Sequence, residues 1–151
     1  MSIANLCHCE VMTILESNSV AEAARVMRYQ HIGFLVVIKP SSEGDTPEIT
    51  GVLTDRDIVI GLVSREADIK LVKVRDVMTR NPLLLNVDSS FDSALHHMRD
   101  SGVRRAPVVS SDGKLMGVLS MDEVVEVLAS HLTCVATALT NERRNEVVTR
   151  T

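Results

Sequence analysis

The sequence predicts an α+β fold made of two β-α-β-β-α repeats that pack through their sheets with pseudo-two-fold symmetry. Three observations predict it. The chain repeats itself, since "GVLTDRD" from Gly51 returns as "GVLSMDE" from Gly117. Apolar residues fall at helical spacing in the matching part of each copy, and β-rich runs follow them. Capping boxes then mark where the helices begin. One such unit is too small to bury both helical faces, so the two should share a core.

Each repeat opens on an entry strand followed by an amphipathic helix. The two copies of these parts are related by one constant shift in residue number, the difference between positions 20 and 91. Under it, the entry strand at 11–14 corresponds to 82–85. The visible match of Val11-Met12-Thr13 to Val77-Met78-Thr79 is therefore misleading. Ser19 and Glu22 form a capping box before the first helix. The helical face has i, i+3, i+4, i+7 spacing in both repeats: Val20, Ala23, Ala24 and Met27 in the first, and Phe91, Ala94, Leu95 and Met98 in the second.

A β-rich run, a hairpin and a second strand follow each helix. The shift becomes smaller here and carries position 51 onto 117, because residues 39–50 form a loop five residues longer than 110–116. The shorter loop contains the Asp-Gly turn signal. Closing helices start after Thr54 and Ser120, with acids three residues on. We expect repeat 1 over 1–66, repeat 2 over 67–130, and over 131–151 a polar tail that forms a fraying helix or stays disordered.

Composition excludes several classes of function. The chain has 151 residues, a net charge of −4, 2% aromatic residues and no tryptophan. These values disfavour nucleic-acid binding by charge or by stacking. Three cysteines argue against a secreted disulfide framework. The N-terminal residues lack signal-peptide features, and no uninterrupted apolar run approaches the length of a membrane span. We expect a cytoplasmic protein that uses neither a membrane nor nucleic acid as a partner.

Three motifs resemble those of cystathionine-β-synthase (CBS) domains: "DVMTRNP" at the entry of a repeat, "GVRRAPVV" at its first β-run and "GVLTDRD" at its second strand. The resemblance covers two copies between about residue 4 and residue 130, so the chain is similar to stand-alone CBS pairs. It implies a regulatory module, not an enzyme, whose clefts bind an adenosine compound. AMP, ADP and ATP are expected, with S-adenosylmethionine and NAD as alternatives. It also implies a homodimer, an unidentified downstream protein and no obligatory cofactor.

The resemblance further implies composite clefts, each with a Ser/Thr-x-x-acid motif whose acid holds the ribose hydroxyls. The carboxylate of Asp57 can accept two bonds from a cis-diol, and arginines match phosphate oxygens. The first cleft would use residues of both repeats, namely Thr54, Arg56, Asp57, Thr79, Leu83, Val103, Arg104 and Arg105. We expect this cleft to bind the ligand. The plain alternative is that Thr54 and Asp57 only cap a helix.

The second cleft departs from the family pattern. Glu123 replaces the aspartate, and Gly33-Phe34 stands where the first cleft has its arginine pair. Its residues would be His8, Ile32, Gly33, Phe34, Ser120 and Glu123. Because it lacks countercharge for a phosphate, we expect it to be weak or empty.

Two alternatives compete with ligand sensing. A structural or interaction dimer with vestigial clefts would fit the same fold. An enzyme is disfavoured, because the sequence shows no P-loop, no G-x-G-x-x-G and no supported catalytic triad. Cys7, His8 and Cys9 suggest a metal centre at first sight, yet zinc needs a fourth ligand and only the distant Cys134 remains. We therefore expect no metal, with Cys7 as a buried thiol and His96 and His97 as structural or surface residues.

Overall fold

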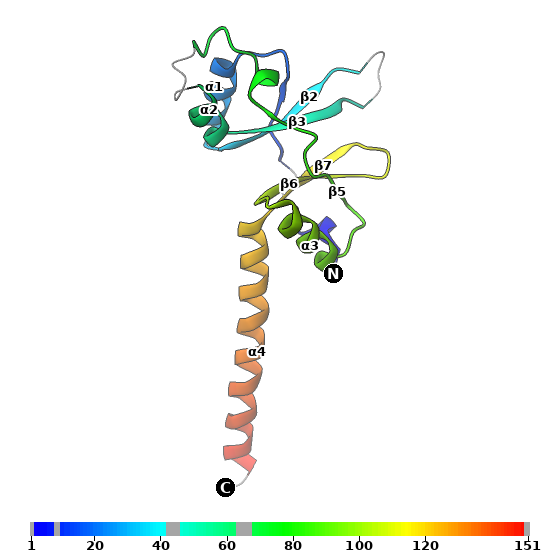
Figure 1. Cartoon of the computed structure of the whole chain (residues 1–151). Coiled ribbons are helices and arrows are strands. Elements are labelled where there is room, and N and C mark those ends of the chain that lie inside the picture. Colours follow the sequence, from blue (N-terminus) through cyan, green and yellow to red (C-terminus); the bar gives the residue numbers. More distant parts are fainter. Residues whose placement is uncertain (1, 8–9, 42–45, 63–67, 150–151) are drawn as a thin grey trace. The chain divides into compact units, whose positions relative to one another are not determined.

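The computed structural model describes residues 2–7, 10–41, 46–62 and 68–149. The chain divides into two compact units, Met1–Leu119 and Ser120–Thr151. The first unit holds all of repeat 1 and repeat 2 as far as its last strand, and the second contains the closing helix of repeat 2 (Figure 1). Each unit is described by itself below.

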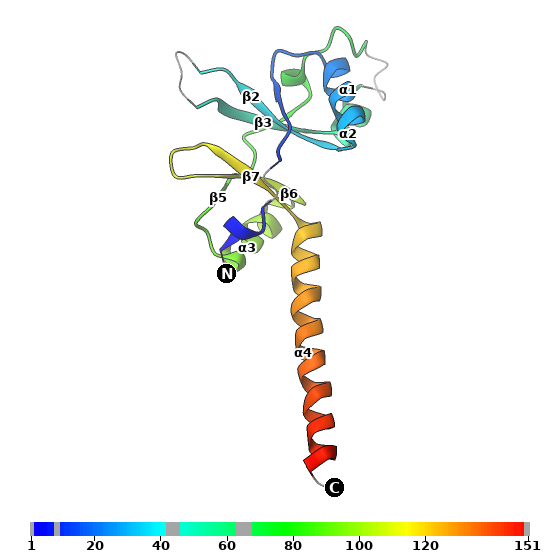
Figure 2. The same ribbon diagram turned by 180° about the vertical axis from the view of Figure 1, so that it is seen from behind.

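The first sheet has four strands in the order β1-β2-β3-β4. Its strands are β1 (Thr13–Leu15), β2 (Phe34–Lys39), β3 (Glu48–Thr54) and β4 (Thr79–Arg80). Strand β1 runs parallel to β2, whereas β3 is antiparallel to both β2 and β4. Helices α1 (Val20–Gln30) and α2 (Asp55–Leu62) contact each other, and they pack against β2 and β3 respectively. Both views show the two helices side by side (Figures 1 and 2).

The second sheet has three strands in the order β5-β6-β7, with β5 parallel to β6. Its strands are β5 (Leu85–Asn86), β6 (Arg105–Val109) and β7 (Leu115–Ser120), and helix α3 (Phe91–Ser101) lies between β5 and β6 in the chain. Strand β4, which precedes β5, is not part of this sheet, because it pairs with β3 of repeat 1. The repeats are therefore joined by a strand that belongs to one and pairs with the other.

The predicted correspondence between the repeats is confirmed by the helices and strands. The shift that carries position 20 onto 91 moves the bounds of α1 onto those of α3. The shift that carries position 51 onto 117 moves β3 onto 114–120, against Leu115–Ser120 for β7. The predicted α+β class and the tandem β-α-β-β-α order are correct. The residue that caps the C-terminus of α1 is His31, which is left-handed with φ 55°. Its counterpart after α3 is Gly102, with φ 64°.

The core is aliphatic, as the near absence of aromatic residues requires. The predicted helical face supplies five of its members, since Val20, Ala23, Met27, Ala94 and Met98 are all buried. Strands β2 and β3 contribute Leu35 and other fully buried side chains. Methionine fills irregular space well because its chain is unbranched and flexible. This supports the prediction that these methionines fill the core.

Each repeat gives a short 3₁₀ segment to the other. Segment η1 (Ile3–Asn5) lies on repeat 2, because the backbone N–H of Ile3 donates to Ser89 O at 3.3 Å and Ser2 pairs with Ser90 in an antiparallel bridge. Figures 1 and 2 show η1, in blue, beside α3.

Segment η3 (Val74–Asp76) makes the matching contacts with repeat 1. The N–H of Val74 donates to Asn18 O at 2.9 Å, and Ser19 pairs with Lys73. The shift that relates α1 to α3 also relates these positions to those of η1 and its partners. The sequence alone did not predict this exchange.

The N-terminus of α1 contains the predicted capping box. The N–H of Ser19 donates to Glu22 Oε2 at 2.7 Å, its hydroxyl donates to the same oxygen at 2.8 Å, and the N–H of Glu22 donates to Ser19 Oγ at 3.2 Å. The backbone bond from Ser19, followed by the bond from its hydroxyl, lowers the pKa of Glu22 below its ordinary value of 4.5. These hydrogen bonds stabilise the ionised carboxylate.

This box should respond to acid in a defined direction. Because the pKa of Glu22 is lower in the folded chain, its stabilising effect is complete well above pH 4.5 and is lost as the pH falls through the folded value. Ser19→Ala should raise the folded pKa of Glu22 in an NMR titration, since it removes the hydroxyl bond. Ser90→Ala, which removes the cap of α3, is the control and should leave the pKa of Glu22 unchanged. A Glu22 pKa equal to that of an unfolded peptide would contradict the prediction.

The second unit contains α4 (Met121–Thr149). Residues 131–149, expected to form a separate polar tail, continue the closing helix of repeat 2 without a break. The tail is also less polar than expected, because Leu132, Val135 and Leu139 expose 56–70% of their surface.

Candidate functional site

Thr54 and Asp57 lie where β3 ends and α2 begins. The N–H and the hydroxyl of Thr54 donate to Asp57 Oδ2 at 2.9 and 2.8 Å, and the N–H of Asp57 donates to Thr54 Oγ1 at 3.1 Å. This is the reciprocal capping pattern that the sequence predicts, and both side chains are half-buried. None of the three bonds uses Asp57 Oδ1. The cap therefore fixes the carboxylate through one oxygen and leaves the other out of the box.

Thr79 reaches the same sheet through β4. It lies opposite Val52 in the antiparallel β3–β4 pair, two residues before Thr54. Direct partners in an antiparallel pair project to the same face, and so do residues two apart on one strand. Thr79, Val52 and Thr54 thus share one face of the sheet, although Thr79 belongs to repeat 2. Among the predicted residues, Thr54 and Asp57 are thus hydrogen-bonded to each other, and Thr79 shares the sheet face of Thr54.

Gly51 permits this pairing. A Cβ atom at Gly51 would lie 2.7 Å from Met78 Sδ and 2.8 Å from Thr79 O. The second contact is to backbone, which cannot move aside as a flexible side chain can. The glycine of "GVLTDRD" is therefore needed for β4 to approach β3 closely. The Arg80 Nη2 atom, next in β4, donates to Arg75 O at 2.8 Å and anchors this short strand.

The other predicted residues of the first cleft, apart from Arg56, come from the second sheet or the segment leading to it. Val103 follows the end of α3, and its N–H donates to Met98 O at 3.0 Å. Arg104 and Arg105 come next, both exposed, with Arg105 as the first residue of β6. Leu83 lies between β4 and β5 and is half-buried, whereas Arg56 is exposed on α2. The predicted cleft thus draws on two sheets.

The residues predicted for the second cleft are found as follows. His8 lies outside the described residues. In the helical unit, the N–H of Ser120 donates to Glu123 Oε2 at 2.8 Å and the N–H of Glu123 donates to Ser120 Oγ at 3.3 Å. Ser120 and Glu123 therefore form the predicted capping box. Ile32, Gly33 and Phe34 are half-buried at the start of β2.

Asp55 is a neighbour of Gly33 that sequence analysis did not identify. Its N–H donates to Gly33 O at 3.2 Å, and a Cβ atom at Gly33 would lie 2.7 Å from Asp55 Oδ2. A carboxylate thus occupies the space that a side chain at position 33 would fill. The signal was present in the sequence, since Asp55 follows Thr54 directly, but only the fold shows which glycine it meets.

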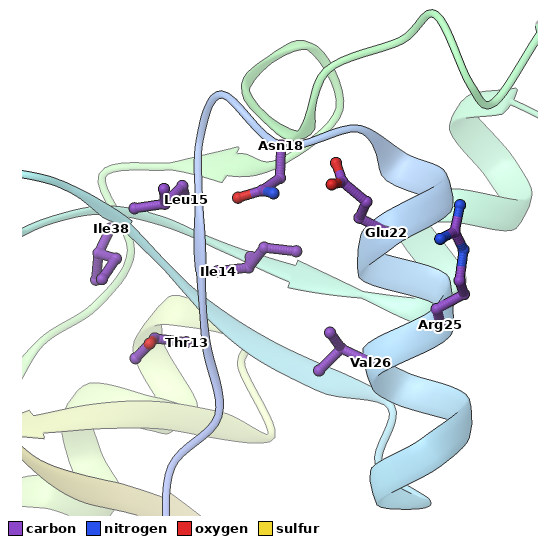
Figure 3. A pocket seen from close by; sticks show the side chains of 8 residues that line it. All are labelled: Thr13, Ile14, Leu15, Asn18, Glu22, Arg25, Val26 and Ile38. Atoms are coloured by element: carbon purple, nitrogen blue, oxygen red, sulfur yellow. The ribbon is translucent and has the colours of Figure 1, made fainter.

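Two cavities lie away from the predicted binding residues. The larger, of about 470 Å³, lies between β1, α1 and β2 and is lined by Thr13, Ile14, Leu15, Asn18, Glu22, Arg25, Val26 and Ile38 (Figure 3). Asn18 and Glu22 lie at one end of it, whereas Arg25 lies on the outer side of α1. Glu22 already serves the cap of α1. The other cavity, about 330 Å³, is lined by hairpin residues and Leu84.

Within the described part of the chain, no group of three or more His, Cys, Asp or Glu side chains could hold a metal ion. Cys9, like His8, lies outside that part. Cys7 is half-buried rather than fully buried, and its Sγ donates to Ala4 O at 3.7 Å. His96 and His97 are exposed on α3, in agreement with a surface role.

Two β-α-β-β-α repeats that exchange their 3₁₀ segments, each with an acid-containing box at the start of its closing helix, define a tandem-repeat α+β module. Comparison with known families gives the same result. The CBS domain model matches residues 3–64 and 74–130, and the chain belongs to this family. CBS pairs are regulatory ligand-binding modules, and those that stand alone are generally not enzymes.

Similar proteins agree with this assignment. An uncharacterized protein of Methanopyrus kandleri is 32% identical over 127 residues. These residues make up 84% of this chain and 62% of that relative's length. A putative signal-transduction protein with CBS domains from Burkholderia ambifaria has a TM-score of 0.73 at 25% identity, covering 86% of this chain and 95% of the other. A CBS domain pair in complex with 5′-methylthioadenosine and S-adenosyl-L-methionine has a TM-score of 0.72 at 18% identity. The match covers 87% of this chain and 98% of the other. This last likeness shows the shared fold.

Proposed function

We propose that this protein senses an adenosine compound through a single site built on Asp57. The observation that carries the proposal is the geometry of its carboxylate. Three hydrogen bonds with Thr54 hold the cap, two of them on Oδ2, and Oδ1 takes part in none of them. A carboxylate fixed in this way can accept a hydrogen bond from a ribose hydroxyl without losing its cap, so capping and binding are compatible roles.

The surroundings of Asp57 suit a nucleoside with an anionic tail. The first N–H groups of α2 favour negative charge through the helix dipole. The hydroxyl of Thr79 lies on the same sheet face as Thr54, and Val52 between them offers an apolar wall. Arg104 and Arg105 would supply positive charge for phosphate. AMP, ADP and ATP are thus the first candidates, with S-adenosylmethionine and NAD sharing the adenosine part.

Gly33 favours a single site. In the order of the repeats it stands where Arg104 stands, and the carboxylate of Asp55 lies against it. A phosphate placed there would meet negative rather than positive charge. We therefore expect one strong site for each chain.

Binding would act by shifting a conformational equilibrium that another protein detects. The size of that shift is limited by the difference in ligand affinity between the two conformations. A cytoplasmic homodimer with no enzymatic activity of its own fits this role. The second candidate function is a structural dimer whose clefts bind nothing. It is favoured by the reciprocal hydrogen bonds of Thr54 and Asp57, which a helix cap alone would explain.

A thermal-shift panel tests the proposal. AMP, ADP, ATP, S-adenosylmethionine and NAD are each added to wild-type protein, Asp57→Ala and Glu123→Ala. A ligand at 100 times its Kd stabilises by about 2.7 kcal/mol, which raises Tm by roughly 5–10 °C in a chain of this size. Wild type and Glu123→Ala should show this rise with at least one compound. Asp57→Ala should lose it.

Both variants remove one acid from a capping box, so Glu123→Ala controls for the loss of a cap. If no compound raises the Tm of wild type at millimolar concentration, the structural alternative is correct. Calorimetry that finds two equal sites in each chain, both present in Asp57→Ala, would overturn the single-site proposal.

A further inference from the structure

Helix α4 exposes an apolar seam, which we define as Val125, Leu128, Leu132, Val135 and Leu139. These side chains expose 62%, 43%, 70%, 58% and 56% of their surface. Successive members of the seam are alternately three and four positions apart, an average of about 3.5. A seam with this period stays on one side of a helix that winds around another, which is the pattern of a coiled coil.

Threonines lie on the face opposite the seam from residue 133 onward. The hydroxyls of Thr133, Thr137 and Thr140 donate to the carbonyl oxygens four residues earlier, at 2.8–2.9 Å. In heptad notation, with Val125 and Leu132 at position a, these threonines fall at positions b and f, which face solvent in a coiled coil. From Leu128 to Leu139 the large apolar side chains of the helix therefore lie on the seam, and the threonines lie opposite it.

We propose that the seam packs against α4 of a second copy of this chain in antiparallel orientation. This proposal concerns an interaction surface and is independent of the ligand site on Asp57. The charge along the helix favours the orientation. Asp122, Glu123 and Glu126 make the first part acidic, whereas Glu142 and Arg143 balance each other near the other end. Parallel copies would bring the two acidic parts together, and antiparallel copies separate them.

Antiparallel packing also gives a consistent register. Placing Leu128 against Leu139 of the second copy puts Leu132 against Val135 of the second copy. Two-fold symmetry then repeats both layers, as an isologous interface requires. In this register Asp122 comes near the level of Arg143 of the second copy. Glu142 continues the seam at position d and lies level with Val125 of the second copy in this register. In a parallel pair it would face Glu142 of the second copy, so two like charges would meet inside the interface.

A lipid bilayer is the competing partner. The segment Met121–Arg143 is long and apolar enough to cross a membrane by length and composition, and its most apolar stretch has a mean hydropathy of 1.3 with 6% of it buried. One such helix is weak evidence. A narrow seam with this period suits a helical partner, whereas a membrane span needs apolar residues on all sides. Asp122, Glu123 and Glu126 would also be costly in hydrocarbon.

Disulfide trapping in the full-length chain tests the proposal. The background is the triple variant Cys7→Ser, Cys9→Ser and Cys134→Ser, in which Leu128→Cys and Leu139→Cys are made separately. Oxidising a mixture of the two proteins should give a crosslinked dimer of one copy of each, because the two positions face each other. Leu128→Cys alone should not crosslink with itself, since in the antiparallel register the two copies of position 128 are eleven residues, about 16 Å, apart along the helix pair.

Sedimentation and vesicle binding complete the test. Leu132→Asp should raise the dissociation constant of the dimer at least about ten-fold, because two carboxylates enter an apolar interface. Thr137→Asp, on the opposite face, is the matched control and should change it less than about two-fold. Crosslinking of Leu128→Cys with itself would overturn the antiparallel arrangement. Flotation of the wild type with phosphatidylcholine vesicles, with no crosslink between positions 128 and 139, would assign the seam to a membrane.

Discussion

Gly51→Val should lower the free energy of unfolding by more than about 3 kcal/mol, the largest effect we expect from a single substitution in this chain. The added side chain would begin 2.7 Å from Met78 Sδ and 2.8 Å from Thr79 O. Met78 could rotate, but the carbonyl of Thr79 is part of the strand that pairs with Gly51 through Arg80. The β3–β4 pair must therefore open or shift. Urea denaturation followed by circular dichroism measures the loss.

Gly61→Ala is the matched control for this prediction. A Cβ atom at Gly61 would lie 3.5 Å from the nearest atom, Cγ1 of Val77, which is an ordinary contact. Gly61 lies in the last turn of α2, and alanine has a helix propensity up to about 1 kcal/mol better than glycine, so this variant should be as stable as wild type or more stable. Equal stability of Gly51→Val and wild type would show that β4 does not approach β3 as described. Because β4 carries Thr79, Gly51→Val should also weaken any ligand binding that uses this residue.

Much of the fold could be predicted because helices of this length leave a clear periodic signal. Ala23 and Met27, like Ala94 and Met98, lie on one helical face, and the burial of these four residues confirms the expectation. The constant shift between the two helical faces locates both helices in the sequence. It also locates the true counterpart of the Val77 segment, which local similarity alone would misplace.

The exchanged 3₁₀ segments could not be predicted in the same way. Each has three residues, too few to show a period, and their contacts are backbone bonds between positions far apart in the chain. The carboxylate of Asp55 beside Gly33 was missed for a related reason, since the contact joins the two ends of the β2–β3 hairpin. These features depend on tertiary pairing, which a pattern within one segment does not encode.

The capping boxes show how far the site itself could be predicted. Thr54 with Asp57 and Ser120 with Glu123 form the expected hydrogen bonds, because such bonds are local. Whether Arg104 and Arg105 point toward a ligand depends on contacts between residues far apart in the chain, so their role stays a prediction. The seam on α4 was overlooked because its apolar residues are separated by threonines and alanines, so the stretch from 131 onward reads as polar.

Ile3→Ala should cost about 3 kcal/mol of stability, a large effect for a residue so close to the start of the chain. Ile3 is fully buried, and its backbone is bonded to Ser89 of repeat 2. Removing three carbon atoms leaves a cavity beneath η1. Val74, its counterpart in η3, is also fully buried, so Val74→Ala should cost about 2 kcal/mol for the smaller volume removed. Chemical denaturation of both variants measures the two losses.

Leu71→Ala is the control that distinguishes the loss of a buried side chain from the loss of the same number of apolar carbon atoms at the surface. Leu71 precedes η3 and is 77% exposed, so this substitution deletes as many carbon atoms as Ile3→Ala but should change stability by less than about 0.5 kcal/mol. Hydrogen exchange adds a local readout, since Ile3→Ala should reduce protection of the Ile3 amide and of its neighbours in repeat 2. If Ile3→Ala were as mild as Leu71→Ala, η1 would not be docked on repeat 2, and the exchange between the repeats would be one-sided.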